Sequence, residues 1–263
     1  MPDALIGYTG FVGTTLLKQH AFDQRFRSVN IKDIDGHEFD LVVCAAAPAQ
    51  KWIANREPDA DRQNIEGLIA HLKTIKCKTF VLISTVDVFK MPVGVDEETP
   101  VDEVGLHAYG LHRRLLERFV EVHFTNHLIV RLPGLVGPGL RKNVIFDFLN
   151  ANNLYAIESR GVFQFYPMVN LWFDIQTALN AGLKLVHLTA EPVSVAELSA
   201  TGFGKTFDHA LADKPATYDL QSRYADIFGG HGVYQYSKRE TIQAVRAYAQ
   251  SELVSIKTEG GKA

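Results

Sequence analysis

Short apolar runs alternate with amphipathic helical segments through the first half of this sequence. The runs at residues 3–8, 39–47 and 78–85 are rich in Val, Ile and Leu, and a segment of helical periodicity follows each of them. Runs that are apolar on both faces indicate strands that are covered on both sides, as in a parallel sheet. Helical connections then place helices on each face of that sheet. The sequence therefore predicts an α/β fold with a doubly wound parallel sheet.

The alternation becomes less regular after about residue 140, so we divide the chain into regions 1–140 and 141–263. We expect some elements of the second region to return to the sheet. The expected strands are 3–8, 26–31, 39–47, 78–85, 127–137 and 184–190, with an extended piece at 161–168. The expected helices are 10–20, 59–75, 107–124, 143–153, 170–183, 194–204 and 237–253.

Two of the expected helices begin with the pattern of a capping box. Ser194 is followed three residues later by Glu197. The helix predicted at 237–253 begins with the same pattern, Ser237 followed by Glu240. Gly202 is expected to close the first of these helices. The last residues, 257–263, are expected to fray.

The overall composition excludes several classes of protein. Lys and Arg number 27 against 30 Asp and Glu, a formal net charge of -3, so no basic excess indicates nucleic acid or an anionic membrane. No secretory signal is recognisable, and no apolar run approaches the roughly 20 residues of a membrane-spanning helix. Cys44 and Cys77 form no C-x-x-C pair, and the ten histidines show no metal-binding spacing. We expect buried thiols, no metal site and a cytoplasmic location.

Three glycines, Gly7, Gly10 and Gly13, lie where the first apolar run meets the first helix. In such a turn the first glycine permits a tight bend, the second lets the backbone approach a pyrophosphate, and the third lets the helix pack closely on the sheet. The helix N-terminus, from Phe11 and Val12 onward, then faces the phosphates. Glycines also cluster in ordinary turns, but a strand before and a helix after favour a dinucleotide site.

The residues in and around the second expected strand bear on the choice between NAD and NADP. Dinucleotide-binding folds often carry an acid about 20 residues after the glycine turn, where it holds the adenosine ribose. Asn30 ends the expected strand instead, and Arg25, Arg27 and Lys32 lie nearby. Without an acid at the strand end a 2′-phosphate is not repelled, and these cations would attract it. The pattern leaves both NAD and NADP open.

A tyrosine and an arginine share one face of the helix expected at 107–124. Tyr109 and Arg113 lie one turn apart, and the cation would lower the tyrosine pKa by stabilising its phenolate. Ser84 and Thr85 end an apolar strand, at the sheet edge where open α/β sheets bind ligands. A hydroxyl there can orient a substrate oxygen beside a tyrosine that acts as general acid or base. Each residue also has an ordinary structural interpretation, as a packing tyrosine or a turn cap.

Together these segments resemble the extended short-chain dehydrogenase/reductase family, in particular its sugar-nucleotide epimerases, dehydratases and reductases. The resemblance rests on six segments in the family's order: GYTGFVG, VVCAAA, NIEG, ISTVDVF, YGLHRRLLE and RLPGLVGPG. It implies a Rossmann-type dinucleotide-binding domain over 1–140 and a small, mainly substrate-binding α/β region over 141–263. The residues that it assigns to the cofactor, beyond the glycine turn and Asn30, are Ala46, Ala47, Arg113 and Pro133. Those that it assigns to catalysis are Tyr109, Arg113, Thr85 and Asn64.

Three departures from the family pattern modify this expectation. Arg113 stands where the family has lysine; it keeps the charge but cannot give up its proton. The dehydratase members carry two acids directly after the threonine, and here Val86 and Asp87 follow, so dehydration is less favoured than epimerisation or reduction. Asp87, Ser84 and Thr85 are candidates for substrate binding. The stretch between the glycine turn and residue 39 holds about one strand where the family usually has two with an intervening helix, so we expect a trimmed adenine side.

The C-terminal region contains one further candidate for substrate binding. In the family an asparagine opens a helix that faces the substrate diphosphate, and Asn143 fills this position, directly after Arg141 and Lys142. A helix N-terminus flanked by cations is a reasonable anion site. The alternative is that Asn143 only caps its helix and that both cations are solvated.

The resemblance implies an NAD(P)-dependent oxidoreductase or epimerase that acts on a nucleotide-activated sugar. Hydride would pass between a sugar carbon and the nicotinamide, with Tyr109 moving the proton. Two alternatives stay open: a non-catalytic dinucleotide-binding sensor or scaffold, which the change to Arg113 favours, and a reductase of a small non-nucleotide carbonyl compound. A homodimer through the helix at 107–124 is expected by analogy.

Overall fold

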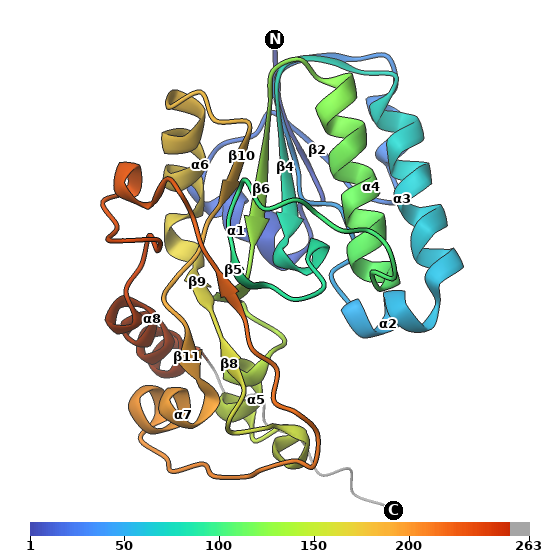
Figure 1. Cartoon of the computed structure of the whole chain (residues 1–263). Coiled ribbons are helices and arrows are strands. Elements are labelled where there is room, and N and C mark those ends of the chain that lie inside the picture. The colour runs from blue at the N-terminus through green and yellow to red at the C-terminus, as the bar shows by residue number, and fades with distance from the viewer. Residues whose placement is uncertain (253–263) are drawn as a thin grey trace, which may run out of the picture.

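The computed structural model describes residues 1–252 and contains a six-stranded parallel sheet (Figure 1). Its strands are β1 (Asp3–Ile6), β2 (Gln24–Phe26), β3 (Glu38–Cys44), β4 (Lys76–Thr85), β6 (His127–Leu132) and β10 (Leu185–His187). They are arranged in the order β10-β6-β4-β3-β1-β2, and every pairing is parallel. The predicted α/β class with a doubly wound parallel sheet is confirmed.

Helices cover both faces of the sheet, because successive strand residues point into two separate cores. In β1, Ala4 and Ile6 are buried in one core together with Ile65, whereas Leu5 is buried in the other together with Leu16. Strands that are apolar on both faces require this double cover. The helices form two pairs on opposite faces (Figure 1): α3 (Pro58–Leu72) with α4 (Ala108–His123), and α1 (Phe11–Gln19) with α6 (Leu171–Asn180).

The edge of the sheet beyond β1 is short, as the sequence indicated. β2 is the last strand on this side, and it has only three residues. The strand predicted at 26–31 was wrong, because β2 ends at Phe26 and a 3-10 helix follows at Ile31–Ile34. Asn30 causes the difference: its Oδ1 accepts the Arg27 N–H at 2.8 Å, and its amide donates to the Arg25 carbonyl at 3.1 Å. Such local bonds close a turn in place of a strand.

The C-terminal half packs below the sheet and also contributes to it (Figure 1). Its own elements surround one apolar core: β7 (Gly134–Val136), α5 (Val144–Asn150), β8 (Val162–Phe163), β9 (Phe165–Pro167), β11 (Val193–Ser194), α7 (Val195–Phe203) and α8 (Lys238–Ser251). β7 pairs with β9, and β8 pairs with β11. In contrast, α6 and β10 return to the main sheet, so residues from about 171 to 187 belong to the N-terminal layers.

The two predicted capping boxes differ in the structure. The box that begins at Ser237 is complete. At α7, Ser194 accepts the Glu197 N–H at 3.2 Å, but the Glu197 carboxylate forms an ion pair with a lysine of α8 instead of returning to the cap. The expected end at Gly202 was wrong by two residues, because Gly204 adopts the left-handed conformation, with φ +68°, that closes the helix.

The sequence did not predict a short helix, α2 (Lys51–Arg56), which follows β3. It also did not predict the pairing of β5 (Val93–Val95) with β12 (Asp219–Leu220), which holds a C-terminal segment beside the end of β4. Among residues 1–252, no helix is both long enough and apolar enough to cross a membrane. The tail at 257–263, for which fraying was expected, lies outside the described residues.

The two cysteines are free thiols. Cys44 is fully buried in β3, and burial raises its pKa to about 11. Cys77 is only partly buried, and the same cause raises its pKa to about 12. Both therefore stay protonated at neutral pH, which makes them poor nucleophiles.

Candidate functional site

The glycine turn joins β1 to α1. Gly7 has φ +87°, and a Cβ added there would lie 2.4 Å from the Ala45 carbonyl oxygen. A Cβ on Gly13 would lie 2.2 Å from the Gly7 carbonyl oxygen, so α1 can approach this closely only with glycine. At Gly10 the nearest atom to an added Cβ is 3.6 Å away, which is ordinary contact. Packing explains the first and third glycines, whereas the open space at the second is suited to a ligand.

The N-terminus of α1 opens at the same turn. Gly10 is the N-cap residue, no side chain caps the helix, and its first turn contains no acid. The side chains of Phe11 and Val12 pack against the neighbouring apolar cores. The first N–H groups of a helix lack partners within the helix, so an uncapped N-terminus attracts an anion.

Small residues after β3 lie directly against this turn. The Ala46 Cα would be 2.8 Å from a Cβ on Gly7, and Ala46 and Ala47 pack against the core below α3 and α4. Ala46, one of the two alanines predicted to lie beside the cofactor, is thus adjacent to the glycine turn.

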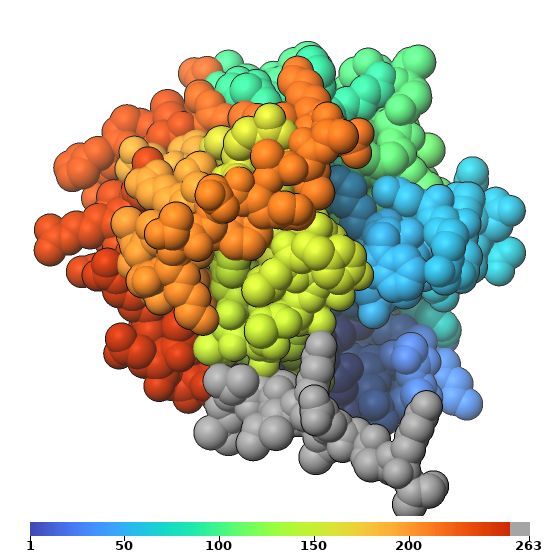
Figure 2. All heavy atoms as spheres, turned by 90° about the horizontal axis from the view of Figure 1, so that it is seen from below, coloured from blue at the N-terminus to red at the C-terminus, as the bar shows by residue number. Residues whose placement is uncertain are grey.

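The next two residues tie this segment to both halves of the molecule. The Pro48 carbonyl accepts a hydrogen bond from Arg113 of α4, and the Ala49 carbonyl accepts one from Lys142 of the C-terminal half. Seen from below, segments of the C-terminal half (yellow-green) lie against N-terminal segments (blue) (Figure 2). The glycine turn, α4 and the segment before α5 therefore meet around residues 45–49.

Tyr109 lies in the first turn of α4, against the end of β4. Its phenol lies beside the side chain of Thr85, the last residue of β4. Gly110 permits this approach, because a Cβ there would lie 2.1 Å from the Asp87 carbonyl oxygen. Asn55 of α2 accepts the Tyr109 N–H at 3.0 Å and so fixes the start of α4. The structure brings the predicted pair together through two residues, Gly110 and Asn55, that sequence reasoning had not singled out.

The electrostatic surroundings of Tyr109 keep its phenol protonated. Burial raises its pKa above the usual value of 10.0, and the positive charge of Arg113 only partly opposes this. The sequence predicted a lowered pKa, because spacing alone shows the cation but not the depth of burial. At neutral pH the side chain is therefore a proton donor.

Arg113 uses four of its five N–H groups within the protein. Two bind the Asp61 carboxylate with N–O distances of 2.5 and 2.9 Å, and two donate to the carbonyl oxygens of Pro48 and Tyr109. The fifth, on Nε, is buried and has no partner among the described residues. The guanidinium carbon lies 4.0 Å from the centre of the Tyr109 ring. Arg113 is thus a paired cation stacked on the ring, not a free donor beside the hydroxyl.

The asparagine predicted to assist this group does not face it. Asn64 lies on the exposed side of α3, and no hydrogen bond joins it to Tyr109 or Arg113 within the described residues. Asp61, one turn earlier, is 5% exposed and also contacts the Nδ1 atom of His112 at 2.7 Å. The sequence could have identified Asp61 by its spacing: it lies four residues before buried Ile65, so both residues are on the covered face of α3.

Ser84 belongs to a buried ionic network. Its hydroxyl donates to Glu117 of α4 at 2.5 Å, and Glu117 also pairs with Arg131 of β6 at 2.7 Å. Both charged residues are at most 2% exposed. The serine hydroxyl is therefore used between β4 and α4, and its role as a substrate ligand has no support from these contacts.

Asp87, predicted to bind substrate, lies at the centre of a different polar cluster. Its Oδ1 atom is 2.7 Å from the Lys51 ammonium of α2 and accepts the Tyr218 hydroxyl at 3.2 Å. Tyr218 directly precedes β12, which lies near the end of β4 (Figure 1). Lys51 and Tyr218 have no recognisable motif, so only the tertiary structure reveals them.

Asn143 acts as a helix cap. Its Oδ1 accepts the N–H groups of Ile145 and Phe146 at 2.9 and 3.4 Å, while its amide donates to the Leu135 carbonyl at 2.8 Å. These contacts favour the capping interpretation over a diphosphate ligand. Pro133 lies between β6 and β7, at the same sheet edge as Thr85.

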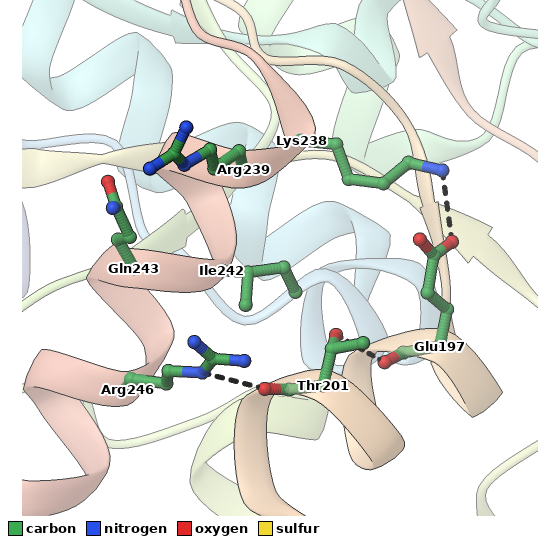
Figure 3. Close-up of a pocket in the computed structure, with 7 residues that line it drawn as sticks. All are labelled: Glu197, Thr201, Lys238, Arg239, Ile242, Gln243 and Arg246. Atoms are coloured by element: carbon green, nitrogen blue, oxygen red, sulfur yellow. Dashed lines mark hydrogen bonds and ion pairs between the residues drawn. The ribbon is translucent and has the colours of Figure 1, made fainter.

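A hollow between α7 and α8 contains none of the predicted site residues (Figure 3). Its polar groups largely satisfy one another: Lys238 pairs with Glu197 at 3.0 Å, and Arg246 donates to the Thr201 carbonyl at 2.8 Å. These bonds join the two helices, so we assign this hollow a structural role.

No protein-family model matches the sequence, and no curated protein matches it. Solved structures do match. A dTDP-4-dehydrorhamnose reductase from Clostridium acetobutylicum is 17% identical, with a TM-score of 0.71 over 95% of this chain and 99% of that one. RMD from Pseudomonas aeruginosa, complexed with NADPH, is 14% identical, with a TM-score of 0.71 over 96% and 100%. MoeE5, complexed with UDP-glucuronic acid and NAD, is 14% identical, with a TM-score of 0.74 over 96% and 100%. The chain therefore has, along nearly its whole length, the Rossmann-type fold of these proteins, and the resemblance seen in the sequence is confirmed for the fold.

Proposed function

We propose that the chain is an NAD(P)-dependent enzyme that reduces or epimerises a nucleotide-activated sugar, with Tyr109 as acid/base. The contact between the Tyr109 hydroxyl and Thr85, at the carboxyl end of β4, carries this proposal. The glycine turn follows the carboxyl end of β1 at the same edge, where open parallel sheets bind ligands. Matching folds complexed with NADPH, or with NAD and UDP-glucuronic acid, support the classes of cofactor and substrate.

The glycine turn fits a dinucleotide. Gly10 leaves space that packing does not need, and the uncapped start of α1 provides N–H groups for a pyrophosphate. A bound nicotinamide would supply or accept the hydride. The residues that would hold the cofactor are Gly7, Gly10, Phe11, Val12, Gly13, Asn30, Ala46, Ala47 and Pro133.

Tyr109 would move the proton. The burial that raises its pKa keeps the phenol protonated at neutral pH, which favours reduction. Hydride would be added to a carbonyl carbon while the phenol proton goes to the carbonyl oxygen, which Thr85 holds. Dehydration is less favoured, because Asp87 is the only acid directly after the threonine segment. A homodimer through α4 and a cytoplasmic location belong to the same proposal.

The test is a substrate panel. Purified protein is mixed with NADH or NADPH and keto forms of UDP-, GDP-, CDP- and dTDP-sugars, and both nicotinamide absorbance and products are followed. We expect turnover with one nucleotide class, and a loss of about 100-fold or more in Tyr109→Phe. Turnover that survives in Tyr109→Phe would remove the tyrosine from the mechanism.

One observation favours a second candidate, a non-catalytic dinucleotide-binding protein. Arg113, in place of the family lysine, is paired with Asp61 and donates to two carbonyl groups, so it is not free to assist the phenol in this arrangement. Cofactor binding without turnover across the whole panel would favour this sensor or scaffold. Turnover with a small ketone alone would favour a reductase of a non-nucleotide carbonyl compound.

A further inference from the structure

Lys51, Asp87 and Tyr218 form one polar cluster, although they come from three separate segments. The Lys51 ammonium is 2.7 Å from Asp87 Oδ1 and 3.4 Å from the Tyr218 hydroxyl, which itself donates to Oδ1 at 3.2 Å. The segments are α2 after β3, the turn after β4, and the residue before β12. These three segments are far apart in the sequence, and their side chains meet only in the folded protein.

The cluster keeps hydrogen-bonding capacity that the protein does not use. Asp87 Oδ1 accepts two bonds, whereas Oδ2 has no hydrogen-bond partner among residues 1–252. Lys51 has three ammonium N–H groups, of which two have protein partners. The side chains of Lys51 and Asp87 are 39% and 17% exposed, so solvent reaches the pair. An unused acceptor therefore lies beside an unused cationic donor.

This capacity lies next to the proposed reacting groups. The Asp87 N–H donates to Thr85 Oγ1 at 3.2 Å, and the Thr85 side chain lies beside the Tyr109 phenol. The charges of Lys51 and Asp87 both act on the Tyr109 phenol, in opposite directions. A substrate whose carbonyl oxygen met Tyr109 and Thr85 would therefore place its neighbouring atoms beside this cluster.

We propose that Lys51 and Asp87, held in place by Tyr218, form a binding subsite for a hydroxyl group of the sugar ring next to the reacting carbon. A hydroxyl is both donor and acceptor, so it can donate to Asp87 Oδ2 while it accepts from Lys51. This inference rests on the proposed function, because it names the feature of the sugar that the same site recognises. It makes the pair a determinant of specificity for hydroxylated rings.

Binding measurements separate the sugar from its nucleotide. Calorimetry on the full chain, with NADH and NADPH present, would use four probes: UDP, dTDP, UDP-glucose and dTDP-glucose. None carries a keto group, so no reduction interferes. In Lys51→Met and Asp87→Ala we expect the affinity for the nucleotide sugar to fall about 10- to 100-fold, because a hydrogen bond to a charged group is lost. The affinity for the bare nucleotide should change less than about twofold.

Two further variants serve as a control and as a test of the supporting tyrosine. Lys90→Met removes a lysine that pairs with Asp102 at the surface, and it should leave all four affinities unchanged. Tyr218→Phe keeps the ring but loses the bond to Asp87, and it should show a smaller loss for the sugar ligand alone. Equal losses for sugar and bare nucleotide, or no loss at all, in variants that melt like the wild type would overturn the subsite. Absence of binding by any nucleotide to the wild type would instead overturn the proposed substrate class, and the subsite with it.

Discussion

The guanidinium of Arg113 binds the carboxylate of Asp61 through both of its terminal nitrogens, while its flat face covers the ring of Tyr109. Arg113 and Asp61 are 3% and 5% exposed, so the pair is shielded from water. A planar guanidinium matches a carboxylate with two parallel bonds, which the compact ammonium of lysine cannot do. Arginine at this position is therefore coupled to an aspartate on α3.

Removal of the carboxylate should destabilise the fold strongly. Asp61→Ala would leave a buried guanidinium unpaired, at a cost of about 3–5 kcal/mol in the free energy of unfolding. Asp59→Ala, on the exposed side of the same helix, should cost less than about 1 kcal/mol. Urea denaturation measures both. In the double variant with Arg113→Met the two costs should not add, and simple additivity would show that the pair is uncoupled.

The sequence was most informative where a local pattern determines the structure. Gly13 meets the main chain of Gly7 and Tyr8 in its own turn, so the spacing of these glycines alone indicates the geometry. Contacts between distant segments have no such pattern. Lys51 follows β3 and Tyr218 precedes β12, and they meet only because β12 pairs with β5 near the end of β4.

Several polar side chains have partners in the structure that the sequence did not identify. Ser84 ends a strand, as predicted, but its hydroxyl binds a buried glutamate of α4. Asn30 was expected to end a strand and instead closes a turn with its own neighbours. Asn143 and its helix were predicted, and main-chain groups occupy its Oδ1 and one of its amide N–H groups. In each case the residue type was informative, but the choice of partner could not be read from it: Ser84 binds a distant glutamate, whereas Asn30 and Asn143 bind main-chain groups nearby in the sequence.

Stability should fall in acid because of His187. Its Nδ1 lies 2.9 Å from the Gln221 carbonyl and its Nε2 lies 3.3 Å from Arg131, which leaves no place for a second proton. Burial, with the Arg131 charge, lowers its pKa from 6.5 to about 3. A depressed histidine pKa means that the unfolded chain binds the proton more tightly, so its contribution to stability is complete above pH 6.5 and is lost as the pH falls toward 3.

The measurement is the free energy of unfolding against pH for wild type and His187→Gln. A single group contributes a slope of at most about 1.4 kcal/mol per pH unit in this window. The variant should be less stable than wild type at neutral pH and should lose stability less steeply below pH 6.5. Parallel curves for the two proteins would contradict the assignment to His187.

The adenine side of the site should favour NADPH over NADH. Arg27 is exposed directly after β2, and no acid ends that strand to repel a 2′-phosphate. Arg27→Ala should weaken NADPH binding about 10-fold or more, through loss of a charge-assisted hydrogen bond, and leave NADH binding nearly unchanged. Fluorescence titration of both coenzymes measures this difference. Lys73→Ala, at the C-terminal end of α3, is the control. Tighter binding of NADH by the wild type would disprove the prediction.

The glycine turn offers a direct separation of folding from binding. In Gly13→Ala the new methyl group would meet the Gly7 carbonyl oxygen at 2.2 Å, so α1 must move, and we expect a loss of about 1–3 kcal/mol in stability, the usual cost of an overpacked core. In Gly10→Ala the nearest atom is 3.6 Å away and φ is -75°, so stability should change by less than about 1 kcal/mol. If a pyrophosphate lies against Gly10, the same methyl group should nevertheless weaken NAD(P)H binding by about 10-fold or more, because it occupies the approach to the main chain.

Thermal melting and coenzyme titration on the two variants measure these effects separately. A Gly10→Ala protein that folds and binds coenzyme like the wild type would show that the open space at this turn is not where a pyrophosphate lies.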